Sequence, residues 1–263
     1  MLRALPRALR LPRPWMSLGA RDCASHSRTP EIQVQALTGH NQGITEILMN
    51  RPHARNALGN VFVSELLEAL AQLREDQQVR VLLFRSAVKG VFCAGADLKE
   101  REQMSAVEVG TFVQRLRGLM SEIASSAVMG LIETTRGLLP GAGGTQRLPR
   151  CLGVALAKEL IFTGRRLNGA QAHELGLVNH AVAQNEEGNA AYQRALALAQ
   201  EILPQAPIAV RLGKVAIDRG MEVDIASGMA IEQMCYDQNI PTQDRLEGMA
   251  AFREKRPPKF VGK

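Results

Sequence analysis

The sequence has few aromatic residues and no long apolar run. Phe, Trp and Tyr together make up 4% of the chain, so stacking on nucleobases or sugars is not an evident theme. No apolar segment approaches the roughly 20 residues that a membrane-spanning helix needs, and we expect no membrane partner. Apolar residues nevertheless reach 46% and charged residues 22%. That composition is typical of a globular α/β or α+β domain.

Cysteine and histidine show none of the spacings that bind metals. No CxxC pair occurs among the four cysteines, which are Cys23, Cys93, Cys151 and Cys235. The five histidines form no HxH or HxxxH pair, and isolated histidines are usually surface or satisfied core residues. We therefore predict neither a disulfide framework nor a metal site. The patterns GxGxxG and GK[ST] do not occur either, which excludes the Rossmann fingerprint and the P-loop.

The first thirty positions contain no lysine and a single acidic residue. This stretch carries six arginines and one acid, Asp22, whereas residues 31–263 hold 26 basic and 25 acidic side chains. The net charge of +6 therefore belongs to the N-terminus and not to a basic nucleic-acid-binding surface. An arginine-rich segment without a continuous apolar core is typical of a mitochondrial transit peptide. We predict such a peptide at residues 1–30, with a disordered basic tail as the alternative, and localisation in the mitochondrial matrix.

Hydrophobic periodicity predicts one layered α/β domain after this segment. Ile32–Leu37 and Ile44–Met49 are short β-type runs around a turn-rich connection, which predicts a hairpin. Apolar residues recur at helical spacing from Gly59 to Asp76. A buried strand is predicted at Val79–Phe84, before the glycine-rich segment Lys89–Asp97. Strand, strand, helix and strand without an internal linker indicate a single domain.

The centre of the chain lacks a helix stop signal. A second amphipathic helix is predicted at Ala106–Ala124 and a strand at Ala127–Thr134, yet neither Gly nor Pro occurs between Gly118 and Gly130. A helix of that length normally ends at such a residue. Further helices are predicted at Gly153–Phe162, Asn168–Leu175, Gly188–Leu203, Pro207–Gly220, Val223–Tyr236 and Gln243–Lys255.

Two segments contain the residue types of a catalytic site. In Phe92–Glu100, FCAGADLKE, small residues let backbone N–H groups approach an anion or an oxyanion, although an ordinary strand-to-helix turn is the alternative. In Gly130–Arg150, GLIETTRGLLPGAGGTQRLPR, Glu133 is a lone carboxylate among apolar residues. That setting suits general acid–base chemistry. A surface glutamate on a strand edge is the alternative.

Together with two later segments, these motifs resemble the crotonase, or enoyl-CoA hydratase/isomerase, superfamily. The later segments are LIFTGRRLNGAQAHELGLVNHAV and DRLEGMAAFREKRPPKFVGK, and the resemblance extends from about residue 32 to the C-terminus. It implies an α/β spiral of ββα repeats over residues 31–200 and a helical trimerisation or lid region over residues 201–263. It also implies a homotrimer or hexamer that takes an acyl-CoA thioester as substrate and uses no cofactor.

The resemblance assigns roles to individual residues. Ala96 matches the position whose N–H holds the thioester oxygen, and Glu133 matches the second of two catalytic glutamates, which protonates Cα. Gly141–Thr145 matches a turn and helix start beneath the site. The residues expected to line the CoA and thioester site are Ala94, Gly95, Ala96, Asp97, Phe252 and Lys255, with Phe260 in the same C-terminal segment.

One unit of the family's pattern is missing. Between Ala124 and Ala127, family members carry a further strand, a triple-glycine turn and a helix, roughly 30 residues by ordinary element lengths. That unit supplies the second oxyanion N–H and the first catalytic glutamate in the pattern GGGxE, which this sequence does not contain. We therefore expect one repeat of the spiral to be incomplete and Glu133 to have no carboxylate partner.

These observations predict a lyase of the enoyl-CoA hydratase type in mitochondrial fatty-acid or branched-chain acyl-CoA metabolism, with its own catalysis impaired. Alternative splicing is one origin of the gap, and a non-catalytic acyl-CoA-binding or trimer-modulating pseudoenzyme is the alternative function. One hydratase of this family binds AU-rich RNA through a lysine-studded helix after its first hairpin. We do not expect nucleic-acid binding here, because Leu58–Leu73 contains neither lysine nor arginine.

Overall fold

A β-hairpin opens the part of the chain that the structure describes. The computed structural model describes residues 29–104 and 128–263. Strands β1 (Ile32–Ala36) and β2 (Ile44–Met49) pair antiparallel, with Ile32 opposite Met49. The connection contains a short 3-10 helix, η1 (Gly39–Asn41), where Gly39 has a φ of 67° that favours glycine. The predicted hairpin is confirmed.

A third strand extends this hairpin into a mixed sheet. Helix α1 (Asn60–Glu75) leads to β3 (Val81–Ser86), which pairs parallel to β2 in the strand order β1-β2-β3. Because β2 is the central strand, it is buried almost throughout its length. Ile44 and Ile47 lie three positions apart and therefore face opposite sides of the sheet, and both are fully buried.

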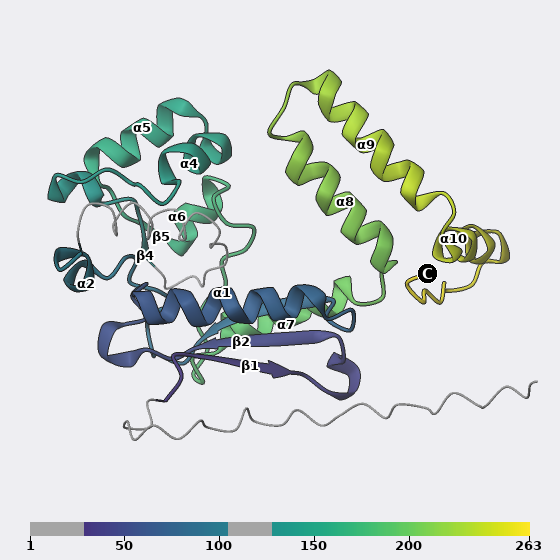
Figure 1. The fold of residues 1–263 in the computed structure, drawn as a ribbon, viewed down its shortest axis with the longest axis horizontal. Coiled ribbons are helices and arrows are strands. Elements are labelled where there is room, and N and C mark those ends of the chain that lie inside the picture. Colours follow the sequence, from purple (N-terminus) through teal and green to yellow (C-terminus); the bar gives the residue numbers. More distant parts are fainter. Residues whose placement is uncertain (1–28, 105–127) are drawn as a thin grey trace, which may run out of the picture.

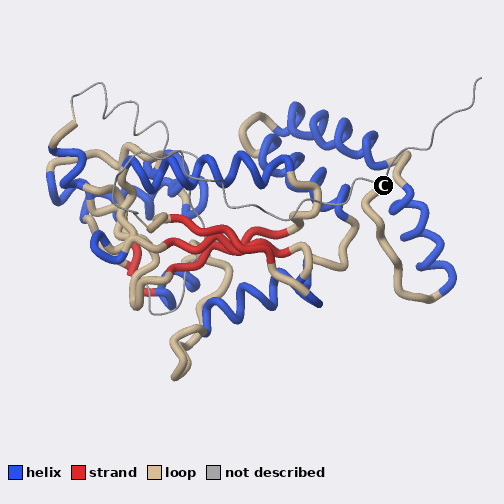
Figure 2. Tube along the Cα trace, turned by 60° about the horizontal axis from the view of Figure 1, so that its bottom comes forward, coloured by secondary structure: helices blue, strands red, loops and turns tan. Residues whose placement is uncertain are grey.

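Helices cover both faces of the sheet, as Figure 2 shows. On one face, Phe62, Val63 and Leu66 of α1 are buried against a cluster that includes Ile47. Their spacing of one, three and four residues puts them on one side of the helix, as the apolar periodicity predicted. On the other face, α7 (Ala190–Ile202) buries Ala199 against Ile44 and Leu83. The result is a three-layer α/β/α arrangement.

The second sheet is small and differs from the strand predicted at Ala127–Thr134. Only β4 (Val128–Met129) is extended, and it pairs antiparallel with β5 (Leu167–Asn168). The backbone then turns into a 3-10 helix, η3 (Glu133–Arg136). After Gly130 the backbone N–H groups bond locally, for example Thr135 to Ile132 at 3.1 Å, instead of to a neighbouring strand. The predicted strand is therefore too long, because a strand persists only where a partner supplies the ladder.

Most of the remaining described chain is helical, as predicted. Around the β4–β5 pair lie α4 (Gly144–Leu152), α5 (Val154–Thr163) and α6 (Gly169–Glu174). Figure 1 shows α8 (Pro207–Gly220), α9 (Ile225–Asn239) and α10 (Gln243–Glu254) projecting to one side of the layered body. Helices α8 and α9 pack against each other as a hairpin.

Two predictions lie outside the described residues. The helix expected at Ala106–Ala124 falls wholly within an undescribed range, and so does nearly all of the expected transit peptide at residues 1–30. Among the described helices, none combines the length and apolar content required to cross a bilayer. The same part of the chain contains no cluster of three or more His, Cys, Asp or Glu side chains arranged for a metal ion.

Candidate functional site

The loop before helix α2 (Leu98–Glu102) lies along the backbone that precedes α1. Ala94 donates to the Arg55 carbonyl at 3.1 Å, and Leu58 donates to the Gly95 carbonyl at 2.8 Å. Asp97 then donates to the Leu58 carbonyl at 3.1 Å. These bonds make a parallel bridge between Leu58 and Ala96. One side of the loop is therefore fixed to the short segment Arg55–Leu58, which we call the backing segment.

This bridge determines the direction of the Ala96 N–H. In a parallel bridge, the groups of the residues on either side of Ala96 point at Leu58, and those of Ala96 itself point away. No other backbone group in the described chain pairs with the Ala96 N–H. Ala94 and Gly95 are exposed, and a Cβ placed on Gly95 would meet nothing within 4 Å. Among the described residues, nothing occupies the outer side of the loop, so its N–H donor is available to a ligand there.

The backing segment begins with two residues in left-handed backbone conformation. After the 3-10 helix η2 (Pro52–Ala54), Arg55 and Asn56 adopt left-handed backbone angles, with φ of 53° and 54°. Asn56 is fully buried, and its amide donates to Ser86 Oγ at 2.9 Å and to the Phe92 carbonyl at 3.1 Å. Its Oδ1 accepts the Arg51 N–H at 2.8 Å. These bonds stabilise the left-handed turn, since asparagine tolerates that region and its side chain is satisfied.

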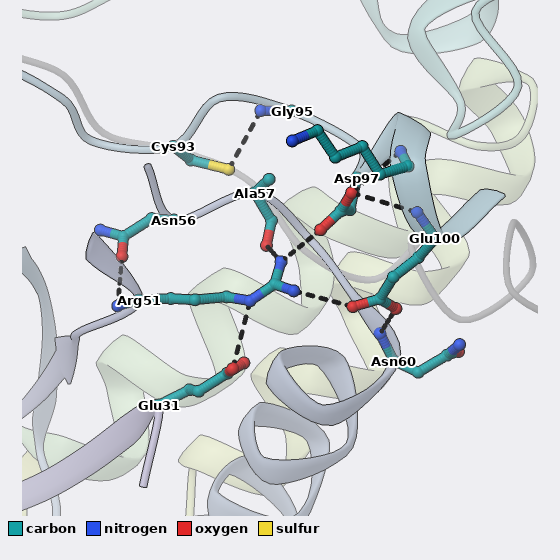
Figure 3. Close-up of polar contacts among 10 residues, drawn as sticks. Glu31, Arg51, Asn56, Ala57, Asn60, Cys93, Gly95, Asp97 and Glu100 are labelled. Carbon is teal, nitrogen blue, oxygen red and sulfur yellow. Dashed lines mark hydrogen bonds and ion pairs between the residues drawn. The ribbon is translucent and has the colours of Figure 1, made fainter. Parts of the chain in front are cut away.

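Arg51 connects this turn to the loop, as Figure 3 shows. Its guanidinium donates from Nη1 to Asp97 Oδ2 at 2.7 Å and to the Ala57 carbonyl at 2.7 Å. Nη2 donates to Glu100 Oε1 at 2.8 Å, and Nε donates to Glu31 Oε1 at 3.2 Å. The side chain is 7% exposed. One buried guanidinium thus ties together the start of β1, the turn before α1, the loop and α2.

Charge balance explains why this cluster is stable. Burial opposes ionisation of Arg51, but the hydrogen bond with Asp97 and the charges of Glu31, Asp97 and Glu100 outweigh it and raise the pKa of Arg51. Burial also opposes ionisation of Asp97. The hydrogen bonds from Arg51 and from the N–H groups of Glu100 and Lys99 outweigh this effect and lower the pKa of Asp97. The Asp97 carboxylate is therefore turned into the protein, and only its backbone borders the outer side of the loop.

Glu133 has much weaker support. It begins η3, an element with no buried residue, and it is only partly buried. Its Oε2 atom is nevertheless shielded from solvent and has no hydrogen-bond partner among the residues that the structure describes. A buried carboxylate oxygen without a partner costs desolvation free energy, and such groups occur where an external ligand or a catalytic role accounts for them. Within the described residues, no hydrogen bond or ion pair joins Glu133 to the Ala94–Asp97 loop.

The turn at Gly141–Thr145 contains the expected helix start. Gly143 has a φ of 91° and precedes α4, which begins at Gly144. A Cβ on Gly144 would lie 2.7 Å from the Leu131 side chain, so glycine allows Leu131 to pack closely there. A shallow groove of about 330 Å³ lies at this turn, between Leu139 and Arg147.

The predicted C-terminal residues form a separate surface. The Lys255 Nζ atom lies 4.7 Å above the Phe252 ring, and Phe252 is 78% exposed. Phe252 and Phe260 line a groove of about 390 Å³ beside α10. Figure 1 places α10 and α2 at opposite ends of the molecule. Within one chain, the structure therefore does not bring Phe252 and Lys255 to Ala96.

Sequence reasoning missed the Arg51 cluster. No motif in the sequence marks Arg51, and its carboxylate partners are 20 to 49 positions away in sequence. A weak signal was present, because Arg51 directly follows a buried strand, where an unpaired charge would be costly.

Comparison with known proteins places the chain in a family. Residues 39–128 and 118–263 match the enoyl-CoA hydratase/isomerase family. The chain is 84% identical to enoyl-CoA hydratase domain-containing protein 2, mitochondrial, of Mus musculus, over the full length of both. Human mitochondrial methylglutaconyl-CoA hydratase is 46% identical over 88% of this chain and 78% of its own length. An enoyl-CoA hydratase from Bacillus anthracis superimposes with a TM-score of 0.81 at 38% identity, covering 89% of this chain and all of its own.

The match to the family model is split into two parts near the centre of the chain. The alignment with the mouse protein runs over 296 positions, 33 more than the 263 residues of this chain. The two family matches meet at residues 118–128, where the sequence lacks a helix stop signal. The mouse relative is named as mitochondrial, in agreement with the localisation predicted from the N-terminus. Family members use no cofactor. The chain belongs to the enoyl-CoA hydratase/isomerase family and has its crotonase-like α/β fold with a helical C-terminal region.

Proposed function

We propose that this chain binds acyl-CoA thioesters at the Ala94–Asp97 loop and hydrates enoyl-CoA much more slowly than an uninterrupted family member. The observation that supports it is the bridge between Leu58 and Ala96, which directs the Ala96 N–H to the outer side of the loop, where no described residue pairs with it. A fixed N–H of this kind stabilises negative charge on a thioester oxygen when water adds to the conjugated double bond.

The chemistry requires more groups than this half of the site offers. Glu133 is the remaining carboxylate of the family pattern, and its unpartnered Oε2 can deliver or accept a proton at Cα. The GGGxE pattern, with the second oxyanion donor and the first glutamate, does not occur in the sequence. Losing one oxyanion donor costs about 10²–10³ in rate, and losing a general base costs about 10²–10⁴. We therefore expect these losses to reduce the rate of hydration more than the affinity for acyl-CoA.

The test compares this chain with a chimaera. The chimaera carries the missing 33 positions of the mouse relative, inserted after Ala124. Calorimetry with butyryl-CoA measures binding, and loss of absorbance at the enoyl thioester band measures hydration of crotonyl-CoA. We expect both proteins to bind and the chimaera to turn over at least about 10² faster. Equal turnover would refute the proposed impairment, and no binding by either protein would refute the site.

We also propose that the C-terminal region, residues 201–263, joins copies of the chain into a trimer. Large apolar side chains are exposed on α8, on α9 and in the turn between them, among them Ile217, Met221 and Ile225, which are 66%, 73% and 82% exposed. A neighbouring copy would also bring Phe252 and Lys255 to the loop from which they are distant within one chain. Light scattering should give three times the monomer mass, and a Met221→Glu substitution should reduce it to the monomer.

The N-terminus and the gap complete the proposal. Residues 1–30 act as a transit peptide, so a reporter fused to residues 1–35 should enter mitochondria and be cleaved. The interrupted alignment supports a shortened splice form of a complete hydratase. Transcript sequencing should then find a longer message that encodes the missing segment. A genomic locus without that segment would favour a pseudoenzyme.

A further inference from the structure

The guanidinium of Arg51 holds the Ala94–Asp97 loop from the protein side. It contacts Asp97, the residue directly after Ala96, and the Ala57 carbonyl, directly before the backing residue Leu58. Both contacts come from Nη1, at 2.7 Å each. The loop and the backing segment are therefore joined in two ways, by the backbone hydrogen bonds of Leu58 and by the Arg51 side chain.

The charges of this cluster make the loop dependent on Arg51. Three carboxylates, from Glu31, Asp97 and Glu100, surround one guanidinium. Glu31 and Asp97 are 4% and 9% exposed, and no described residue bonds to Glu31 Oε2. Without the guanidinium, buried carboxylates would repel one another, and Asp97 would move toward water. Because Asp97 adjoins Ala96, that movement would rotate the peptide whose N–H points to the open side.

Gly59 shows how little room the cluster has. A Cβ on Gly59 would collide with Glu100 Oε1 and would lie 2.9 Å from Arg51 Nη1. Gly59 has extended backbone angles, with φ of −97° and ψ of 174°, so alanine causes no backbone strain there. A Gly59→Ala substitution therefore pushes on the Arg51–Glu100 pair without changing any charge.

We propose that Arg51 is a positioning residue for the thioester site: by holding Asp97 and the Ala57 carbonyl, it aims the Ala96 N–H at the thioester oxygen without touching the substrate. This inference rests on the function proposed above. A hydrogen bond weakens steeply as its angle departs from linearity, so a rotated donor loses much of its effect on a carbonyl. Misplacement by about 1 Å can cost about 10²-fold in rate.

The experiment observes the thioester carbonyl directly. Difference infrared spectroscopy of butyryl-CoA labelled with ¹³C at the thioester carbon gives the carbonyl stretch, which falls when the oxygen accepts a hydrogen bond. Butyryl-CoA has no double bond to hydrate, so the measurement does not depend on turnover. The wild-type chain should lower the stretch relative to free butyryl-CoA. Arg51→Lys, which keeps the charge but not the planar fork, should lose about half of this shift or more.

Two further variants separate positioning from general loss of stability. Gly59→Ala should also reduce the shift, by less than Arg51→Lys. Arg85→Met is the matched control, because Arg85 also pairs with a buried carboxylate, Glu46 at 3.5 Å, but lies on the sheet away from the loop. It should lower the melting temperature and leave the carbonyl shift unchanged. Affinity for free CoA should stay within about twofold in all three variants, since the thioester oxygen contributes nothing to it.

The possible outcomes distinguish a failure of the proposed function from a failure of the role of Arg51. If the wild-type chain binds butyryl-CoA without lowering its carbonyl stretch, Ala96 is not a donor and the proposed function fails together with this inference. If the wild-type shift is present and Gly59→Ala and Arg51→Lys retain it in full, only the role of Arg51 fails. Should Arg51→Lys not fold, Gly59→Ala decides alone. A shift lost equally in Arg85→Met would reduce Arg51 to an ordinary structural residue.

Discussion

The two parts of the candidate site differ in how the protein supports them. The Ala94–Asp97 loop is supported by a three-stranded sheet, by the buried apolar side of α1 and by an ion cluster whose central side chain, Arg51, is 7% exposed. Glu133 lies in a 3-10 helix without buried residues, beside a sheet of two-residue strands and a helix, α4, that buries no side chain. The alignment gap lies in the chain between these two parts. A missing strand and helix would deprive the second part of its neighbours and leave the first intact.

The largest expected difference between the two parts is in core packing. Phe62→Ala removes a fully buried ring beneath the loop and should lower the free energy of unfolding by about 3–5 kcal/mol. Leu139→Ala, near Glu133, removes a side chain that is 72% exposed and should change it by about 0.5 kcal/mol or less. Urea denaturation measures both. Comparable losses would mean that Leu139 is covered in the assembled protein.

A second difference concerns the two acids. Asp97→Asn weakens a buried ion pair and a charge-assisted bond at 2.7 Å, so it should cost about 2–3 kcal/mol of unfolding free energy. Glu133→Gln replaces a partly buried acid whose Oε2 has no partner, and it should cost about 0.5 kcal/mol or less. Thermal melting at neutral pH compares them. A large loss in Glu133→Gln would show that its carboxylate has a structural partner.

The same contrast explains what the sequence predicted well. The hairpin, α1 and the C-terminal helices follow from local periodicity, and their observed ends differ from the predicted ones by a few residues at most. The strand predicted to reach Thr134 failed, because strand length depends on a neighbour that local sequence does not encode. Arg51 was missed for a related reason. Its carboxylate partners come from two segments distant from it in sequence, and only the fold brings Glu31 together with Asp97 and Glu100.

Acid should selectively weaken the loop side of the molecule. The folded-state pKa of Asp97 is lowered, so as pH falls the unfolded chain takes up a proton before the folded chain does. The contribution of Asp97 to stability is therefore complete above about pH 4 and is lost as pH falls through its lowered pKa. Unfolding free energy should fall more steeply below about pH 4 in the wild type than in Asp97→Asn.

High salt provides the control for this pH series. Asp224, which is exposed, and Glu247, which is partly exposed, also have lowered pKa values, from hydrogen bonds with Ser227 and Arg256 respectively. At about 1 M salt, interactions of exposed charges are screened within about 3 Å, while the buried Arg51–Asp97 pair is screened much less. The difference in slope between wild type and Asp97→Asn should persist there. Its disappearance would show that surface charges cause the acid sensitivity.

The smallest expected effect is a difference in thiol reactivity between the two parts. Cys93 lies in the loop segment, half-buried, and burial raises the pKa of its thiol, although its sulfur accepts a weak bond from the Gly95 N–H at 3.4 Å. Cys151 lies in α4 and is exposed. The thiolate is the reactive form, and each unit of raised pKa lowers its fraction about tenfold near neutral pH. Iodoacetamide at pH 7.5 should therefore modify Cys151 before Cys93, as peptide mass spectrometry would show. Faster labelling of Cys93 would mean that the loop opens in solution, and the rigidity on which the thioester site depends would then be lost.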